Sequence, residues 1–248
     1  MMKNAFEAIT GRGDGKNSLL FLCDHASNAL PEGGLGLAPG LLATHIAYDI
    51  GAAAVTRALA AAYGAPALLG AWSRLLIDLN RGADDPTIVM KLSDGSVIPG
   101  NRDAGAGEVA RRIAAWHAPY HAAIAAELDR IGQETNKGAT VISMHSFTPA
   151  WKGRRRPWDV GVLYDRDTRL SAPLMTRLAE AGFSVGDNEP YTGALEGDTL
   201  YQHGTLRGLP HVLIEIRQDL IETDTAAQAF ALRLKPILDA ALSDMRRS

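Results

Sequence analysis

The sequence predicts an α/β fold in which helices cover both faces of a mixed central sheet. Short apolar runs rich in Leu, Ile and Val alternate with longer Ala/Leu-rich segments of helical period. The short runs are apolar on both faces, which is typical of strands buried between two helix layers. Because no repeat and no change in composition marks a linker, we expect one three-layer α/β/α domain.

Each expected strand is a short apolar run that ends at polar residues, glycine or a turn. In chain order the runs are SLLFLC (18–23), APALLG (65–70), RLLIDL (74–79), ATVISM (139–144), VGVLY (160–164) and HVLIEI (211–216). The second and third runs are close enough in the chain to form a hairpin. We therefore expect a mixed sheet rather than a purely parallel one.

Each expected helix is a longer segment with apolar residues at intervals of three and four. In chain order these segments are 41–63, 106–133, 168–181 and 224–246. Two long irregular stretches, 80–105 and 186–210, remain between the elements. Loops longer than ~12–15 residues in compact domains tend to carry function, so we expect both loops at one edge of the sheet.

The composition is that of an ordinary soluble protein and argues against several classes of partner. The chain has 248 residues, of which 46% are hydrophobic, and its net charge of −3 gives no reason to expect nucleic acid or an anionic membrane. It lacks a signal-peptide core and any apolar stretch near the ~20 residues of a membrane span. The single cysteine, Cys23, excludes an internal disulfide and fits a reducing compartment, so we expect a cytoplasmic protein.

Polar side chains follow or end four of the expected strands. They are Asp24 and His25, Asn80 and Arg81, His145 and Ser146, and Glu215 with Arg217. In open α/β sheets such side chains converge at the carboxyl ends of the strands, where ligands bind. Two histidines, a carboxylate and an arginine are the groups that metal-assisted hydrolysis requires: metal ligands, a proton shuttle and an anion clamp.

Each of these residues also has a simpler interpretation. A strand-end histidine is commonly a packing or hydrogen-bonding residue, and Asn80-Arg81 could form an ordinary turn. Glu215 lies inside an apolar run, where burial of a carboxylate is costly unless it is paired or functional. Its simplest alternative is an ion pair with Arg217, which lies on the same side of the strand.

Several longer motifs resemble the N-formylglutamate amidohydrolase family. They are LCDHASNALP, HIAYDIGA, WSRLLIDLNR, ISMHSFTP, VGDNEPYTG and LPHVLIEIRQDLI, which follow the family's order from about residue 18 to 222. The sequence is most similar to the broader branch of the family, which is less firmly tied to histidine degradation. The resemblance implies a single catalytic domain over 1–248 and a metal-dependent amidohydrolase that removes an acyl group, such as formyl, from an acidic amino acid.

A more distant resemblance implies roles for individual residues. SMHSF, DLNR and IEIR are similar to segments of zinc carboxypeptidases, whose phosphorylase/hydrolase-like plan aspartoacylase and succinylglutamate desuccinylase share. By this resemblance His25 and His145 would bind Zn²⁺ or another divalent transition metal, and Glu215 would be the general base and then the acid. The remaining implied roles are the substrate carboxylate clamp for Asn80 and Arg81, oxyanion stabilisation for Arg74, and closure over the substrate for Tyr191.

The third metal ligand is left open by the sequence. The related enzymes place a glutamate three residues after the first histidine, and here that position is Asn28, whose neutral amide is a poorer zinc ligand. The third ligand could be Asn28, Asp24 or Asp49. Asp49 lies four residues after His45 in the expected helix 41–63, so the two would share a helix face.

Two other functions fit parts of the sequence. The chain could be a non-catalytic binder of carboxylate ligands that has a weakened metal site. Cys23 and His25 could also form a nucleophilic pair, since alternate strand residues point to the same side, although a single buried cysteine is usually inert packing.

His117 and His121 flank Pro119, which indicates a helix start or kink, and we expect both histidines at the surface. The small-molecule partner expected from the leading interpretation is an N-acyl amino acid, and the sequence does not define an oligomeric state.

Overall fold

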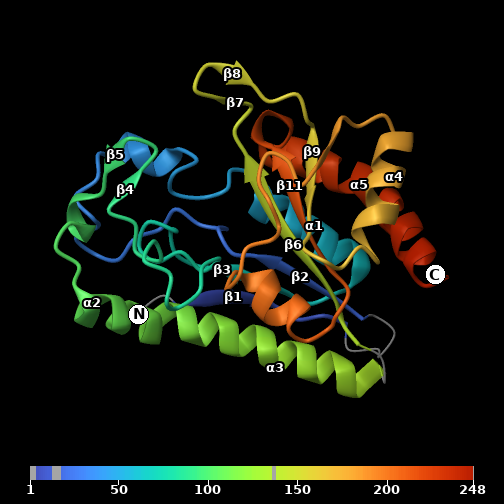
Figure 1. The fold of residues 1–248 in the computed structure, drawn as a ribbon, viewed down its shortest axis with the longest axis horizontal. Coiled ribbons are helices and arrows are strands. Elements are labelled where there is room, and N and C mark those ends of the chain that lie inside the picture. Colours follow the sequence, from blue (N-terminus) through green and yellow to red (C-terminus); the bar gives the residue numbers. More distant parts are fainter. Residues whose placement is uncertain (1–3, 13–17, 136–137, 248) are drawn as a thin grey trace.

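The computed structural model describes residues 4–12, 18–135 and 138–247 and contains a seven-stranded sheet with helices on both faces (Figure 1). The strand order is β1-β3-β2-β6-β11-β9-β10. The strands are β1 (Phe6–Ile9), β2 (Leu19–Cys23), β3 (Ala67–Gly70), β6 (Thr140–Phe147), β9 (Val160–Leu163), β10 (Val185–Asp187) and β11 (His211–Arg217). Strands β3, β2, β6 and β11 are parallel to one another, whereas β1 and β9 run antiparallel to their neighbours β3 and β11. The predicted α/β class and mixed sheet are confirmed.

The helices divide between the two faces of the sheet. Helices α1, α4 and α5 pack together on one face, and α3 covers the other (Figure 1). The helices are α1 (Ala52–Tyr63), α2 (Ala106–Arg112), α3 (Ala118–Thr135), α4 (Ser171–Glu180) and α5 (Asp224–Met245). Two small hairpins, β4 (Leu92–Ser93) with β5 (Ser96–Val97) and β7 (Ala150–Trp151) with β8 (Arg154–Arg155), lie outside the main sheet. Among the described residues, no helix combines the length and apolar character needed to cross a bilayer.

Side chains alternate between two hydrophobic cores along the central strands. In β2, Phe21 and Cys23 face the core under α1 and α5, whereas Leu22 faces the core on the α3 side. The same alternation turns His145 of β6 and Glu215 of β11 toward the α3 side. These two residues are register partners in adjacent parallel strands, so the sheet itself places a histidine beside a glutamate at its carboxyl edge.

The predicted strand 74–79 is wrong. This segment forms a buried series of turns, held by bonds from the backbone N–H of Ser73 to Ala29 O and from that of Arg74 to Ala47 O. The predicted hairpin is therefore also wrong, and the antiparallel neighbour of β3 is β1, which is short and partly exposed. A short apolar run has no periodicity that distinguishes a buried strand from a buried loop, which is why the sequence misleads here.

The predicted helices 41–63 and 106–133 are partly correct. The first becomes α-helical only at Ala52, after Gly51, which has φ of 79° and where a Cβ would collide with the carbonyl of Ile221. His45 and Asp49 therefore share no helix face. The second is continuous from α2 to α3 through a π turn at Ile113–His117, which ends two residues before Pro119. The π turn accommodates the proline, which has no N–H to donate.

Candidate active site

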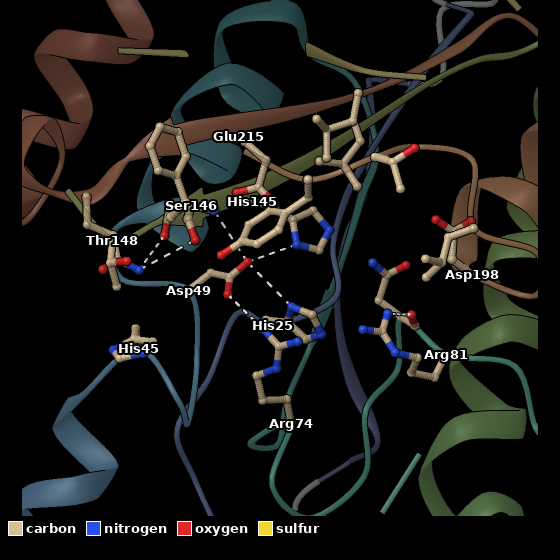
Figure 2. Close-up of a pocket in the computed structure, with 18 residues that line it drawn as sticks. His25, His45, Asp49, Arg74, Arg81, His145, Ser146, Thr148, Asp198 and Glu215 are labelled. Carbon is tan, nitrogen blue, oxygen red and sulfur yellow. Dashed lines mark hydrogen bonds and ion pairs between the residues drawn. The ribbon is translucent and has the colours of Figure 1, made fainter. Parts of the chain in front are cut away.

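A cavity of about 470 Å³ opens at the carboxyl ends of β2, β6 and β11 (Figure 2). Its wall contains nearly all the predicted site residues: His25, Arg74, Asn80, Arg81, His145, Tyr191 and Glu215. Among the predicted ligands, Asn28 does not line the cavity, and its side-chain amide donates to Leu42 O at 2.8 Å. The ends of the parallel strands and the loops that follow them therefore bring most of the predicted site residues together at one edge of the sheet, as the strand-end pattern predicts.

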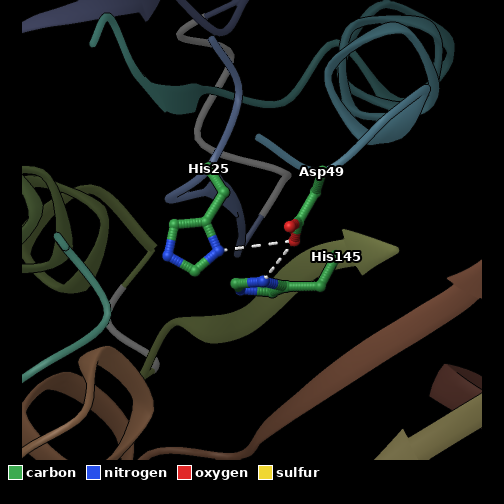
Figure 3. Close-up of side chains that lie close together, drawn as sticks. All are labelled: His25, Asp49 and His145. Atoms are coloured by element: carbon green, nitrogen blue, oxygen red, sulfur yellow. Dashed lines mark hydrogen bonds and ion pairs between the residues drawn. The ribbon is translucent and has the colours of Figure 1, made fainter. Parts of the chain in front are cut away.

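Two histidines and one aspartate form a candidate metal-binding group (Figure 3). His145 Nδ1 lies 2.8 Å from Asp49 Oδ2, and His25 Nδ1 lies 3.4 Å from the same oxygen. One potential ligand atom from each residue falls within 4.8 Å of the others. Asp49 lies in the turn before α1, where its backbone N–H donates to His25 O at 3.0 Å. The structure thus places Asp49, rather than Asn28, beside the two histidines.

Two further carboxylates, Asp78 and Asp24, fix the orientation of the histidine rings. His25 Nε2 lies 2.7 Å from Asp78 Oδ1, and His145 Nε2 lies 3.1 Å from Asp24 Oδ2. Because an ionised carboxylate only accepts, each Nε2–H donates outward and each Nδ1 faces Asp49. Metal-ligating histidines usually have such outer carboxylates, which set the tautomer and the ring orientation. The sequence signal for Asp78 was an aspartate inside the apolar run LLIDL, which burial obliges to find a partner.

The buried charges of this cluster compensate one another. Burial raises the pKa of Asp49, but the charges and hydrogen bonds of His25 and His145 outweigh it and hold this pKa well below the ordinary value. Burial likewise opposes ionisation of Asp24, yet its contacts with His145 lower the pKa to about 2. Burial lowers the pKa of His145, but its bonds to Asp24 and Asp49 raise it well above the ordinary value. The carboxylates of Asp24, Asp49 and Asp78 form an anionic cage around the two rings, which favours a positive charge on or between the rings.

The donor set fits a transition-metal ion. Two imidazole nitrogens and one carboxylate oxygen are the usual protein ligands of a catalytic zinc site, which keeps a further position open. The outward-facing bonds to Asp24 and Asp78 leave both Nδ1 atoms available for ligation once their protons are displaced. The residues present thus match the metal that the sequence resemblance implies.

Glu215 is buried beside this group with one oxygen unsatisfied. Its Oε2 has no hydrogen-bond partner among the described residues, and burial raises its pKa to about 7. Arg217 instead pairs with Asp159 Oδ1 at 3.0 Å and with Asp219 Oδ1 at 2.7 Å, so the alternative of a Glu215–Arg217 ion pair is wrong. A carboxyl group that titrates near neutrality in a polar cavity is suited to take up and release a proton.

Arg74, Asn80 and Arg81 line the cavity beyond the metal-binding group, and Figure 2 shows the two arginines. Arg74 is held between Asp49, at 3.4 Å, and Asp78, at 3.1 Å. Asn80 is fixed by its side-chain oxygen, which accepts from Thr199 N at 3.0 Å. Arg81 lines the cavity and donates Nη1–H to Asn80 O, while its Nε lies 3.8 Å from Asp85 Oδ2. Arg81 is thus more weakly engaged by carboxylates than Arg74 is.

Tyr191 lies at the mouth of the cavity, about half exposed, and its hydroxyl accepts from Arg156 Nη2 at 3.2 Å. Sequence reasoning does not single out Leu195 and Asp198, which also line the cavity, because they lie in the irregular stretch 186–210 outside any motif. Thr148 and Gln218 line it as well and lie within the motifs ISMHSFTP and LPHVLIEIRQDLI, but nothing in those motifs assigns them a role. Cys23 faces the opposite core, and burial raises its thiol pKa well above the ordinary value. A Cys23–His25 nucleophilic pair is therefore excluded by geometry.

Metal binding by this cluster should weaken as the pH falls. Burial lowers the pKa values of His145 and His25, but the neighbouring carboxylates outweigh it and raise both above the ordinary value, so ligation near neutral pH must release protons. We expect the affinity for Zn²⁺ to fall by about tenfold per pH unit for each proton released, measured by competition with a chelator of known affinity. An affinity independent of pH between about pH 8 and about pH 6 would contradict ligation by these histidines.

A buried, charged cavity at the carboxyl edge of a three-layer α/β fold is the arrangement of an enzyme of the α/β class. Residues 17–222 match the family model described as N-formylglutamate amidohydrolase, and the chain belongs to that family of hydrolases. A comparison with curated protein sequences gave no significant match.

Solved structures extend this similarity over nearly the whole chain. A gene product of Agrobacterium tumefaciens is 33% identical with a TM-score of 0.92, covering 98% of this chain and 97% of that one. The N-formylglutamate amidohydrolase from Ralstonia eutropha is 23% identical with a TM-score of 0.72, covering 98% and 99%. A bacteriophage poly-gamma-glutamate hydrolase shares the fold at 11% identity and a TM-score of 0.50, covering 98% and 90%.

Proposed function

We propose that this protein is a metal-dependent amidohydrolase that cleaves the N-acyl amide of an acidic amino acid such as N-formylglutamate. The observation that carries the proposal is the buried His25–Asp49–His145 group next to the unsatisfied carboxyl of Glu215. The family supplies the reaction class, and the geometry supplies candidate ligands and a proton carrier. As part of the same proposal, residues 1–248 form one catalytic domain.

The metal would be held by His25, His145 and Asp49, with Asp78 and Asp24 fixing the two rings from behind. When bound, Zn²⁺ or a similar divalent ion would polarise the amide carbonyl and make water a stronger acid. Two neutral imidazoles and one carboxylate leave the group with a net positive charge, which the surrounding carboxylates compensate.

Glu215 would carry the proton between water and the leaving nitrogen. In hydrolysis the water oxygen bonds to the acyl carbon, the C–N bond breaks, and the amine nitrogen needs a proton to leave. A carboxyl group with a pKa of about 7 can accept the first proton from water and deliver it to nitrogen, because both protonation states are accessible near neutrality. Arg74, fixed by Asp49 and Asp78, would stabilise the oxyanion that develops on the carbonyl oxygen.

Asn80 and Arg81 would hold the free α-carboxylate of the substrate. Both line the cavity, and Arg81 retains donor capacity because its contact with Asp85 is long and partly exposed. An arginine can bind a carboxylate through two parallel hydrogen bonds, which gives orientation as well as affinity. Tyr191 would cover the bound molecule from the cavity mouth.

Arg81→Ala should raise KM for substrates with a free α-carboxylate by about 10- to 100-fold, because a charge-assisted bidentate contact is lost. The same change should alter KM much less for the corresponding neutral α-amides. Steady-state kinetics on matched N-formyl amino acids and their amides provide the measurement. An equal effect on both substrates would argue against the clamp.

The direct test of the proposed function is a hydrolysis screen with controlled metal content. Purified protein would be stripped with a chelator, reloaded with Zn²⁺, and assayed on N-formyl, N-acetyl and N-succinyl amino acids. We expect about one metal ion per chain by elemental analysis, and release of formate from an acidic N-formyl amino acid only in the loaded protein. No metal uptake, combined with carboxylate binding by calorimetry, would favour the non-catalytic binder instead.

A further inference from the structure

Three buried histidines lie together behind the residues of the proposed clamp. His117 is 4% exposed, His121 8% and His203 7%, so the expectation that His117 and His121 lie at the surface is wrong. The ring centroids of His117 and His121 are 4.1 Å apart, and those of His121 and His203 are 5.1 Å apart. Pro119 indicates a helix start or kink, and a π turn does precede it at Ile113–His117, but this signal does not tell which face of the helix is buried.

Two of these histidines bind the backbone of the clamp directly. His121 Nε2 lies 2.9 Å from Leu79 O, and His117 Nε2 lies 2.8 Å from Arg81 O. Because a carbonyl oxygen only accepts, each ring donates its Nε2–H. The carbonyls on either side of Asn80 are thus each held by an imidazole, and Asn80 and Arg81 follow the position of these carbonyls.

The direction of the remaining bond follows from the first two. Neutral His121 with a proton on Nε2 has an unprotonated Nδ1, and this atom lies 2.9 Å from His203 Nε2. His203 must therefore donate its Nε2–H to His121. A proton on His121 Nδ1 would point at that donor, and burial together with the neighbouring rings lowers the pKa of His121 to about 3. Burial lowers the pKa of His203 to about 4. Both rings are therefore neutral, and the hydrogen bonds run in one direction, from His203 to His121 and from His121 to Leu79 O.

The segment that carries His203 also anchors the clamp by other contacts. Thr199 N donates to Asn80 Oδ1 at 3.0 Å, and Thr199 Oγ1 lies 3.0 Å from Asp24 Oδ1, which belongs to the carboxylate that orients His145. His117 and His203 each lie in a π turn, at Ile113–His117 and Tyr201–Thr205. Single π turns within helical segments are rare and are frequent at functional sites.

We propose that His121, supported by His117 and His203, is a positioning residue that sets specificity for a substrate carboxylate. It does so by fixing the backbone of Leu79–Arg81 and hence the direction of the Arg81 guanidinium. The ring nitrogens that face Leu79, Arg81 and one another are already engaged, so the cluster acts through the clamp rather than as a ligand site. This inference rests on the proposed function of Arg81 as the carboxylate clamp.

The test compares two replacements of His121. Leucine removes both hydrogen bonds, whereas the amide of glutamine can donate to Leu79 O and accept from His203. His121→Leu should raise KM for an N-formyl amino acid about tenfold, leave kcat within about threefold, and leave KM for the neutral α-amide nearly unchanged. His121→Gln should stay within about threefold of the parent protein for both substrates.

Thr56→Val is the matched control, because Thr56 is also buried and donates to a backbone carbonyl, Ala52 O, at 2.8 Å, but lies in α1 on the opposite face of the sheet. It should show no difference between carboxylate and amide substrates. If His121→Leu does not fold, His203→Leu removes the donor to His121 and should change KM in the same direction by a smaller factor. Added to Arg81→Ala, either variant should have little further effect, because it acts through that guanidinium.

Three outcomes would overturn the inference: an unchanged KM in His121→Leu, equal effects on acid and amide substrates, or a full additional effect in the Arg81→Ala background. The result for Arg81→Ala alone distinguishes failure of the positioning role of His121 from failure of the proposed carboxylate clamp. If Arg81→Ala does not discriminate acid from amide, the proposed clamp itself fails. If Arg81→Ala discriminates and His121→Leu does not, only the positioning role is lost.

Discussion

Glu215→Gln is expected to reduce kcat by about a thousandfold while metal content and fold remain intact, because a positioned general acid–base group contributes about 10²–10⁴ to the rate. The amide has nearly the shape of the carboxyl but cannot carry a proton between water and the leaving nitrogen. The measurements are the rate of formate release at saturating substrate and the metal content by elemental analysis. Near-normal turnover in this variant would remove Glu215 from the mechanism.

The same variant has a thermodynamic signature that is independent of activity. Burial raises the folded-state pKa of Glu215 above that of the unfolded chain, so its contribution to stability is fully present below the unfolded pKa and is lost as the pH rises through about 7. Glutamine does not titrate. The metal-free variant should therefore gain stability over the metal-free parent above pH ~7, and the difference should shrink toward pH ~4. Glu222→Gln, at an exposed position, is the control and should leave kcat unchanged.

The three residues that the apolar pattern itself identifies are polar groups at or within apolar runs: His25 and His145 follow such runs, and Glu215 lies inside one. His25, His145 and Glu215 stand out because a polar group at the end of a buried strand has few structural reasons to be there. Parallel strands then bring their carboxyl ends to one edge, so three positions far apart in the chain become neighbours. The fold class and the edge that carries the cavity follow from the same pattern.

Asp49 illustrates what such a pattern leaves open. Its side chain reaches the histidines because the chain follows a 3-10 turn and then irregular turns until Gly51, and only then begins α1. Helical periodicity over 41–63 hides that delay, because turns and helices can carry the same spacing of apolar residues. The position of a loop aspartate depends on tertiary contacts, such as the bond from Asp49 N to His25 O. The resemblance that places a metal ligand at position 28 carries no information about these tertiary contacts.

Asp78 and the buried histidines show a second limit. Asp78 lies in a run whose pattern predicts a strand, yet the segment folds as turns around Arg74 and His25. Burial of these groups is tolerated because each charge meets an opposite charge or a donor, whereas an unpaired one would cost several kcal/mol. Such pairing is visible only in three dimensions. A charged residue in an apolar run predicts that the charge has a partner, but the sequence does not identify that partner.

Asp49→Asn should abolish stable metal binding, lowering bound Zn²⁺ from about one ion per chain to less than about a tenth after dialysis. The substitution leaves two imidazoles and replaces the anionic ligand by a neutral amide of the same size, which is a much poorer zinc ligand. Activity should fall to the level of the chelated protein. Elemental analysis and calorimetric titration with Zn²⁺ provide the measurement.

The decisive comparison for Asp49 is Asn28→Ala, because the sequence resemblance points to Asn28 as the third ligand, with Asp24 and Asp49 as alternatives. Asn28 donates its amide to Leu42 O and does not line the cavity, so its removal should leave about one metal ion per chain. The reverse result, with metal retained in Asp49→Asn and lost in Asn28→Ala, would transfer the ligand role to Asn28. Loss of metal in both variants would mean that the loop holding Asn28 supports the site through its bond to Leu42. Retention in both would leave the two histidines needing a ligand from elsewhere, and the anionic cage around the two rings would then serve only to orient them.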